Sequence, residues 1–161
     1  MGTVLKLSEA IKARAKLAEA GKTLILTNGH FDLLHIGHLD YLEKARSLGD
    51  ALFVGINGDH STAVLKGTGR PIVPAVDRAR LVAALSCVDA AIIFEEETAI
   101  TLVNVLKPDI YAKGGDYHLK PLPESSAVEA IGGKVILIDL VPERSTTALI
   151  ARIRALPEAK R

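Results

Sequence analysis

The sequence is poor in cysteine, which limits the scaffolds and sites it can build. Its single cysteine, Cys87, cannot form a disulfide within the chain or a thiolate zinc site. Because Cys87 lies in an apolar stretch, we expect a small buried side chain, with a reactive thiol as the alternative. A lone free thiol also fits a reducing compartment.

Long hydrophobic runs and an excess of one charge are missing as well. The apolar runs are only as long as a strand, and nothing at the start of the chain resembles a secretory signal, so we expect no membrane partner. The formal net charge is +1 without a basic stripe, which argues against nucleic acid as a partner. These absences together predict a cytoplasmic protein.

Aromatic residues are scarce, at 4% of the chain with no tryptophan, whereas 48% of the residues are hydrophobic. The core must therefore be built from Leu, Ile, Val and Ala, which is typical of strands buried on both faces of a parallel sheet. The length of 161 residues predicts a single domain over residues 1–161.

Apolar segments of strand length alternate with amphipathic segments of helix length. We expect strands at 23–27, 51–56, 90–94, 109–112 and 134–138, and helices at 8–20, 38–48, 75–86, 98–106, 123–131 and 146–156. This alternation predicts an α/β, doubly wound (Rossmann-like) fold with a five-stranded parallel sheet and helices on both faces. Ligands of such folds bind beyond the carboxyl ends of the strands, so the residues that follow the strands are the candidates for chemistry.

Two histidines follow the first of these strands. His35 and His38 are three positions apart at the start of a helix, with Gly37 between them. A helix N-terminus offers free N–H groups to phosphate, and two imidazoles there can stabilise charge that develops during phosphoryl transfer. The alternatives are structural histidines or zinc ligands, although two histidines without a Cys cluster are too few for a zinc site.

The segment His35-Ile36-Gly37-His38, preceded by Gly29-His30-Phe31-Asp32, resembles the HxGH signature of the cytidylyltransferase-like nucleotidyltransferases. The resemblance extends in order from about residue 27 to residue 153, through residues 41–50, the basic loop at 66–71, Asp77-Arg78, residues 113–117 and residues 144–147. Within that family, these segments most resemble those of the heptose 1-phosphate adenylyltransferases.

The resemblance implies a role for each matched position. The catalytic residues would be His35, His38 and Lys66. The nucleotide would be bound by Gly29, Phe31, Gly37, Arg78, Lys113, Gly114, Asp116, Ser145, Thr146 and Thr147. The acceptor substrate would be bound by Asn28, His30, Asp32, Arg70 and Arg144, and Asn57 and Asp59 are further candidates because they follow the second strand. The alternatives are an ordinary solvated lysine for Lys66, an ion pair for Arg78 and helix capping alone for residues 145–147.

The implied activity is transfer of AMP from ATP to a sugar 1-phosphate (heptose 1-phosphate), which gives ADP-heptose for lipopolysaccharide and releases pyrophosphate. Mg²⁺ would be bound through the nucleotide phosphates with no secure protein ligand, the loop at 66–74 would order on binding triphosphate, and the enzyme would be a homodimer.

Other functions remain open. Glycerol-3-phosphate cytidylyltransferase and FAD synthetase share the HxGH and Ser-Thr-Thr segments, and a nucleotide-binding module without turnover is a more distant alternative. His30 departs from the heptose enzymes, where a small residue or Cys is expected, and this leaves the acceptor open.

Overall fold

The computed structural model describes residues 2–115, 122–142 and 144–157. Its centre is a parallel six-stranded sheet with the order β1-β4-β3-β2-β5-β6. The strands are β1 (Thr3–Val4), β2 (Leu24–Gly29), β3 (Ala51–Asn57), β4 (Ala90–Phe94), β5 (Ile110–Gly114) and β6 (Lys134–Ile138). The α/β class is as expected, but the prediction of five strands was wrong. Strand β1 carries no signal in the sequence, because it is two residues long and exposed and pairs only at the edge of the sheet.

The helices are α1 (Leu7–Glu19), α2 (Ile36–Arg46), α3 (Asp59–Lys66), α4 (Ala75–Ala83), α5 (Ile100–Leu106), α6 (Ser125–Ala130) and α7 (Thr146–Arg154). Only α3 has no counterpart in the prediction, which placed a turn after residue 56. Its buried residues are the polar Ser61 and Thr62, while Val64 and Leu65 are exposed. The helix therefore lacks the apolar stripe from which helices are recognised in a sequence.

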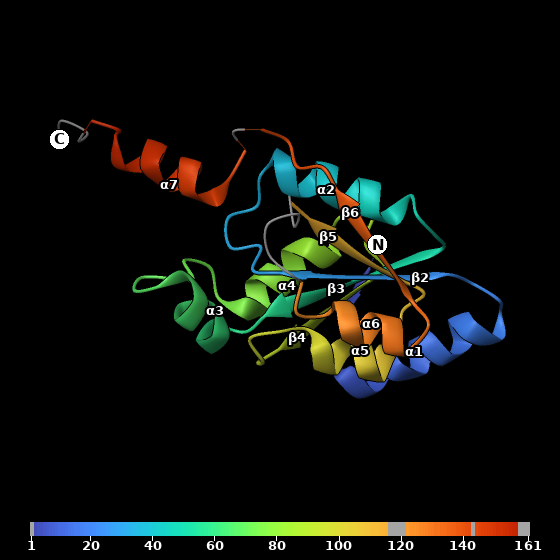
Figure 1. The fold of residues 1–161 in the computed structure, drawn as a ribbon. Coiled ribbons are helices and arrows are strands. Elements are labelled where there is room, and N and C mark those ends of the chain that lie inside the picture. Colours follow the sequence, from blue (N-terminus) through green and yellow to red (C-terminus); the bar gives the residue numbers. More distant parts are fainter. Residues whose placement is uncertain (1, 116–121, 143, 158–161) are drawn as a thin grey trace.

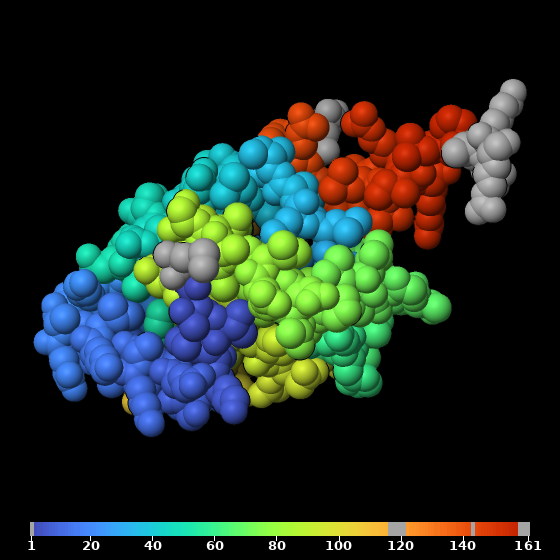
Figure 2. All heavy atoms as spheres, turned by 180° about the vertical axis from the view of Figure 1, so that it is seen from behind, coloured from blue at the N-terminus to red at the C-terminus, as the bar shows by residue number. Residues whose placement is uncertain are grey.

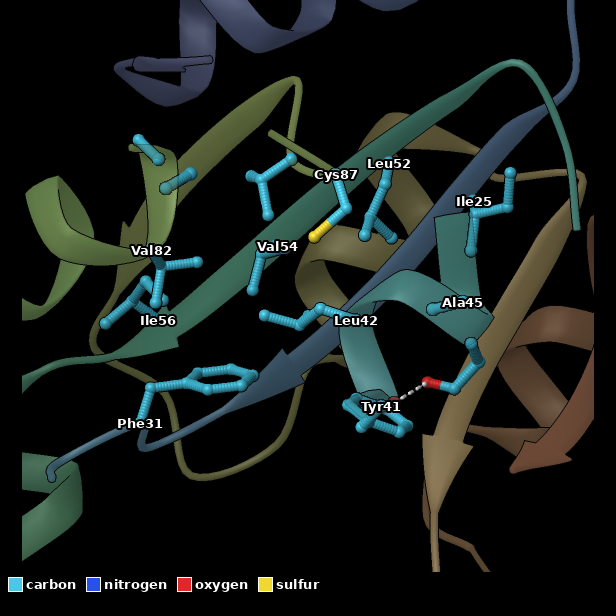
Figure 3. Packing of buried hydrophobic residues seen from close by; sticks show 14 of the residues in the cluster. Ile25, Phe31, Tyr41, Leu42, Ala45, Leu52, Val54, Ile56, Val82 and Cys87 are labelled. Carbon is cyan, nitrogen blue, oxygen red and sulfur yellow. Dashed lines mark hydrogen bonds between the residues drawn. The ribbon is translucent and has the colours of Figure 1, made fainter. Parts of the chain in front are cut away.

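The sheet separates two hydrophobic clusters, because successive residues of a strand point to opposite faces. In β3, Leu52 and Val54 pack with α2 and α4, as Figure 3 shows for the first cluster. Ala51 and Phe53 face the second cluster, to which α1, α5 and α6 contribute. In Figure 1, α2 lies on one side of the strands and α1, α5 and α6 lie on the other. Cys87 is buried in the first cluster, as predicted.

The strand order places a switch point beside β2. The chain proceeds from β2 through β3 to β4 in one direction and returns to β5 and β6 on the other side of β2. The carboxyl ends of β2 and β5 therefore diverge into connections that run to opposite sides, and such a crevice is where doubly wound folds bind ligands. Residues 28–30 and 113–114 lie at this edge.

Helix α7 is the part of the described chain least covered by the rest. Figures 1 and 2 show it projecting from the body of the protein. No residue of α7 is buried, and Ile153 is 58% exposed. None of the helices within the described residues is long and apolar enough to cross a membrane.

Candidate active site

Two adjoining pockets open at the carboxyl edge of the sheet. The first, the histidine pocket, has a volume of about 280 Å³ and is lined by His30, Phe31, Asp32, His35, Gly37, His38, Tyr41, Lys66, Arg70, Leu140, Val141, Arg144, Ser145, Thr146 and Thr147. The second, the Glu124 pocket, has a volume of about 310 Å³ and is lined by Asn28, Gly29, His30, Asn57, Leu65, Lys66, Glu97, Thr98, Lys113, Leu122, Pro123 and Glu124. His30 and Lys66 line both, so they mark the boundary between the pockets.

The histidine pair lies against the start of α2. His35 is the residue before the helix, with extended backbone, and its ring stacks on that of His38 with the centroids 3.8 Å apart. The Phe31 ring packs against the His38 ring, with the ring centroids 5.2 Å apart. The Nδ1 atoms of both histidines are buried without a partner among the described residues. Nε2 is therefore the nitrogen that each ring can offer to a ligand.

Both rings are held in the neutral form in the free site. Burial lowers the pKa of His35, and burial together with the proximity of His35 lowers the pKa of His38 to about 4. A neutral imidazole with its proton on Nε2 still donates a hydrogen bond. A bound polyphosphate would favour the cationic form and raise both pKa values.

A second helix begins at the same pocket. Ser145 precedes α7, and its hydroxyl accepts a hydrogen bond from the Ala148 N–H at 3.1 Å, which confirms capping. Thr146 and Thr147 also line the pocket. The N-terminal ends of α2 and α7, both positive ends of helix dipoles, thus meet at one pocket, an arrangement that favours an anion.

Gly37 allows this meeting of the two helices. A Cβ at this position would lie 3.0 Å from the Cβ of Arg144 and 3.0 Å from Nδ1 of His35. The sequence suggested that Gly37 makes space for a nucleotide. In the structure it makes space for Arg144 and for the His35 ring, so any larger side chain would push the start of α7 away from the histidines.

Lys66 is exposed at the C-terminal end of α3, and residues 67–69 after it are exposed too. Residues 70–73 of the basic loop are bound by Asp32, which is 2% exposed. Its carboxylate accepts hydrogen bonds from Ile72 N and Val73 N, each at 2.8 Å, and from Nε of Arg70. Asp32 therefore binds Arg70, Ile72 and Val73 of the loop in this structure. That the loop at 66–74 orders on binding triphosphate stays a prediction.

The pKa of Asp32 reflects the same contacts. Burial alone would raise it, but the N–H groups of Val73 and Ile72 and the guanidinium of Arg70 outweigh burial and hold the pKa below its ordinary value. The carboxylate is thus engaged in binding the loop. Asp32 also lines the histidine pocket, and its assignment as a ligand of the acceptor substrate stays a prediction.

Arg78 and Asp59 also differ from their predicted roles. The Arg78 side chain is fully buried and donates to Val73 O at 2.8 Å, to His30 O, and to Oδ1 of Asp59 at 2.8 Å. Asp59 further accepts from Ala75 N at 2.8 Å. Neither residue lines the two pockets. Three of its N–H groups are bonded within the protein, so in this structure Arg78 supports the backbone around His30 and forms the ion pair that was the alternative.

Two residues assigned to different ligands lie together in the Glu124 pocket. Lys113, predicted to bind nucleotide, donates from Nζ to Oδ1 of Asn28 at 2.7 Å, and the Tyr111 hydroxyl donates to the same oxygen. Burial lowers the pKa of Lys113, and attraction to Glu124 opposes part of this change. Lys113 thus lines the Glu124 pocket and not the histidine pocket. Asn57 lines the Glu124 pocket as well.

The remaining predicted positions divide between the pockets and the scaffold. Phe31, Arg70 and Arg144 line the histidine pocket and Gly29 lines the Glu124 pocket. A Cβ on Gly114 would lie 2.6 Å from Cδ2 of Leu140, so this glycine allows Leu140 to pack closely. Asp116 lies outside the described residues. Sequence reasoning missed Glu124 and Thr98, which belong to segments without a recognisable motif. It also gave no role to Tyr41, although residues 41–50 are part of the family resemblance.

The described residues contain no group of three or more His, Cys, Asp or Glu side chains placed to hold a metal ion. Asp32, the carboxylate that lines the histidine pocket, is already bound to the loop. The site thus supplies cations, imidazoles and helix N-termini to a polyphosphate ligand, and its own described residues do not form a metal centre.

Comparison with known proteins agrees with this geometry. The model of the cytidylyltransferase-like family matches residues 26–155. The chain is 52% identical over 133 residues to the bifunctional protein HldE of Syntrophotalea carbinolica, covering 83% of this chain and 27% of that protein. It is 45% identical over 151 residues to the bifunctional protein HldE of Geotalea uraniireducens, covering 93% of this chain and 31% of that protein. The chain therefore spans less than a third of the length of these relatives.

Two solved structures have a similar fold. The lipopolysaccharide core biosynthesis protein from Thermoplasma volcanium is 33% identical with a TM-score of 0.63, covering 75% of this chain and 98% of that one. The pantothenate synthetase from Thermus thermophilus, at 16% identity and a TM-score of 0.57, shares the fold over 88% of this chain and 62% of its own. The family match, the relatives and the histidine pocket lead to one conclusion: the chain belongs to the cytidylyltransferase-like family of nucleotidyltransferases.

Proposed function

We propose that the protein transfers AMP from ATP to heptose 1-phosphate, giving ADP-heptose for lipopolysaccharide and pyrophosphate. The observation that carries the proposal is the histidine pocket, where a stacked histidine pair and two helix N-termini face one cavity that adjoins a second through Lys66. The choice of a heptose rests on the resemblance of the sequence segments to heptose 1-phosphate adenylyltransferases. The name of the Thermoplasma volcanium relative, a lipopolysaccharide core biosynthesis protein, supports the same choice.

The reaction needs no nucleophile from the protein. An oxygen of the acceptor phosphate attacks the α-phosphorus of ATP in line, a new P–O bond forms, and the bond to the β-phosphate oxygen breaks, so that pyrophosphate leaves. Nε2 of His35 and His38 would donate to phosphate oxygens that gain charge in the transition state. Lys66, at the boundary of the pockets, would lie between the two sets of phosphates and hold them for attack.

Mg²⁺ enters this scheme as part of the substrate, MgATP. It neutralises charge on the phosphates and leaves with pyrophosphate. No described side chain is assigned to it. The task left to the protein is to orient the triphosphate, and the ends of α2 and α7 suit that task.

The activity is tested by pyrophosphate release in the presence of Mg²⁺. ATP and CTP are each paired with heptose 1-phosphate, glycerol 3-phosphate and FMN. We expect release only with ATP and heptose 1-phosphate. Release only with CTP and glycerol 3-phosphate, or with ATP and FMN, would keep the reaction class and overturn the substrate. Bound ATP without release in any pair would favour a nucleotide-binding module.

We also propose a cytoplasmic homodimer, since ATP is a cytoplasmic substrate and the chain exposes an apolar helix surface. Leu149, Ile150 and Ile153 follow helical spacing in α7, and none of them is buried. A second copy would cover this surface. Light scattering should give twice the mass of 17.1 kDa, and Ile153→Asp should give the single mass. A wild-type monomer would contradict the proposal.

A further inference from the structure

The Glu124 pocket contains a buried carboxylate oxygen without a partner. The Glu124 side chain is 3% exposed, and its Oε1 accepts a hydrogen bond from the Ala99 N–H at 2.9 Å. Its Oε2 is buried and has no hydrogen-bond partner among the residues that the structure describes. A buried polar atom without a partner is costly, so an oxygen left in this state at a pocket wall points to a ligand that donates to it.

His30 presents an imidazole at the boundary of the same pocket. Its Nδ1 lies 3.0 Å from Oγ1 of Thr62, and that hydroxyl lies 3.4 Å from the carbonyl of Asn57. Thr62 thus orients the ring through Nδ1. Burial, together with Lys66, Arg78, Lys113 and Arg70, lowers the pKa of His30 to about 4 and keeps this ring neutral.

Charges are unevenly placed around the pocket. Lys66 lies at the boundary with the histidine pocket, whereas Glu124 lines only the pocket that bears its name. A phosphate is attracted to the boundary by Lys66 and repelled by the carboxylate. Hydroxyl groups suit the opposite end, because a carboxylate accepts strong hydrogen bonds from them.

We propose that the Glu124 pocket binds a phosphorylated polyhydroxy acceptor, and that Oε2 of Glu124 selects this acceptor by accepting a hydrogen bond from one of its hydroxyl groups. The inference rests on the proposed function, because it places the acceptor phosphate at the Lys66 boundary, next to the nucleotide. It adds a specificity residue that lies outside the histidine and Ser-Thr-Thr segments. An acceptor without a hydroxyl at the matching position leaves Oε2 buried and unpaired, and is discriminated against.

The variant Glu124→Gln tests this directly. Its amide oxygen can still accept from Ala99 N, but an NH₂ group replaces Oε2 and cannot accept a hydrogen bond. We expect the KM for heptose 1-phosphate to rise at least about tenfold, with the KM for ATP unchanged. Glu129→Gln, an exposed position of α6 outside both pockets, is the matched control and should keep both values.

Two outcomes would overturn the proposal. One is an acceptor KM within about twofold of wild type. The other is a joint rise of both KM values with a lowered Tm, which would mean that Glu124 only supports the Ala99 backbone. Should Glu124→Gln fail to fold, Glu124→Asp keeps the charge and withdraws the carboxylate from the pocket, and the same rise in acceptor KM is expected.

A binding measurement separates this inference from the proposed function. Calorimetry with heptose 1-phosphate, in the presence of a non-hydrolysable ATP analogue, needs no turnover. Binding to wild type that weakens at least about tenfold in Glu124→Gln, together with no pyrophosphate release when wild type is given ATP, Mg²⁺ and heptose 1-phosphate, would support the pocket and refute the activity. Normal turnover with equal acceptor binding in both proteins would support the activity and refute the role of Glu124.

Discussion

The two pockets share one edge of the sheet but are built from different parts of the chain. The histidine pocket is formed mainly by residues between 30 and 41 and by residues 140, 141 and 144–147, which lie at or near the starts of α2 and α7. The Glu124 pocket collects single residues from the ends of several strands and from the start of α6. The first arrangement provides helix dipoles and imidazoles for polyphosphate, and the second provides scattered hydrogen-bonding groups for a shaped polar ligand.

From this difference we expect substitutions of the histidines in the histidine pocket to lower turnover most. His38→Ala removes a donor to the transition state and should lower kcat on the order of 10²–10³-fold, and His35→Ala should act alike. The KM for the acceptor should change little. His60→Ala, an exposed histidine on α3 outside both pockets, is the control. Near-normal turnover in His38→Ala would remove the assigned role.

Because Lys66 lines both pockets, its substitution should weaken the binding of both substrates. Lys66→Ala is expected to raise the KM for ATP and for the acceptor together, by about tenfold each, whereas Glu124→Gln raises only one. Steady-state kinetics with each substrate varied in turn measures this, with the exposed Lys12→Ala as the comparison. A change confined to one substrate would place Lys66 in a single pocket.

Asp32 joins the histidine pocket to the basic loop, so its loss should be seen first in stability. Asp32→Asn weakens the hydrogen bonds to residues 70–73 and should lower the free energy of unfolding by about 1–3 kcal/mol. Urea denaturation gives the value, and limited proteolysis should locate new cleavage near residue 70. An unchanged unfolding midpoint would mean that these bonds contribute little.

The smallest expected effect is a pH dependence of nucleotide binding. In the free protein the pKa of His38 is lowered to about 4, mainly by burial, so the ring is neutral near pH 6. A bound triphosphate raises this pKa, so binding should take up protons and tighten a few-fold as pH falls from 7 to 6. Calorimetry in two buffers of different ionisation enthalpy measures the uptake. If wild type and His38→Ala took up the same number of protons on binding triphosphate, the protons would bind at a group other than His38.

The same contrast explains what could be predicted from the sequence. His35, Gly37 and His38 are neighbours in the chain and mark a helix start, so local spacing was enough to find them. Asp32 and Arg78 make their contacts because the loop at residues 70–73 folds back onto them. The spacing of residues in the sequence does not indicate such a contact. Glu124 immediately precedes the short helix α6, and only the tertiary structure brings it to the pocket of Lys113 and Asn57.

For the fold, the buried strands were found because each is a continuous apolar run. Helix α3 and strand β1 were missed because neither buries an apolar stripe. The sequence therefore predicts what apolar periodicity or adjacency encodes, and it fails where polar residues such as Ser61 and Thr62 form the buried face.

The assignment of the two ligands to the two pockets is tested most directly by a crystal structure with heptose 1-phosphate and a non-hydrolysable ATP analogue. We expect the triphosphate against His35, His38 and the start of α7, the acceptor phosphate between Lys66 and His30, and a sugar hydroxyl on Oε2 of Glu124. A nucleotide seated in the Glu124 pocket, or an acceptor bound elsewhere, would contradict the account.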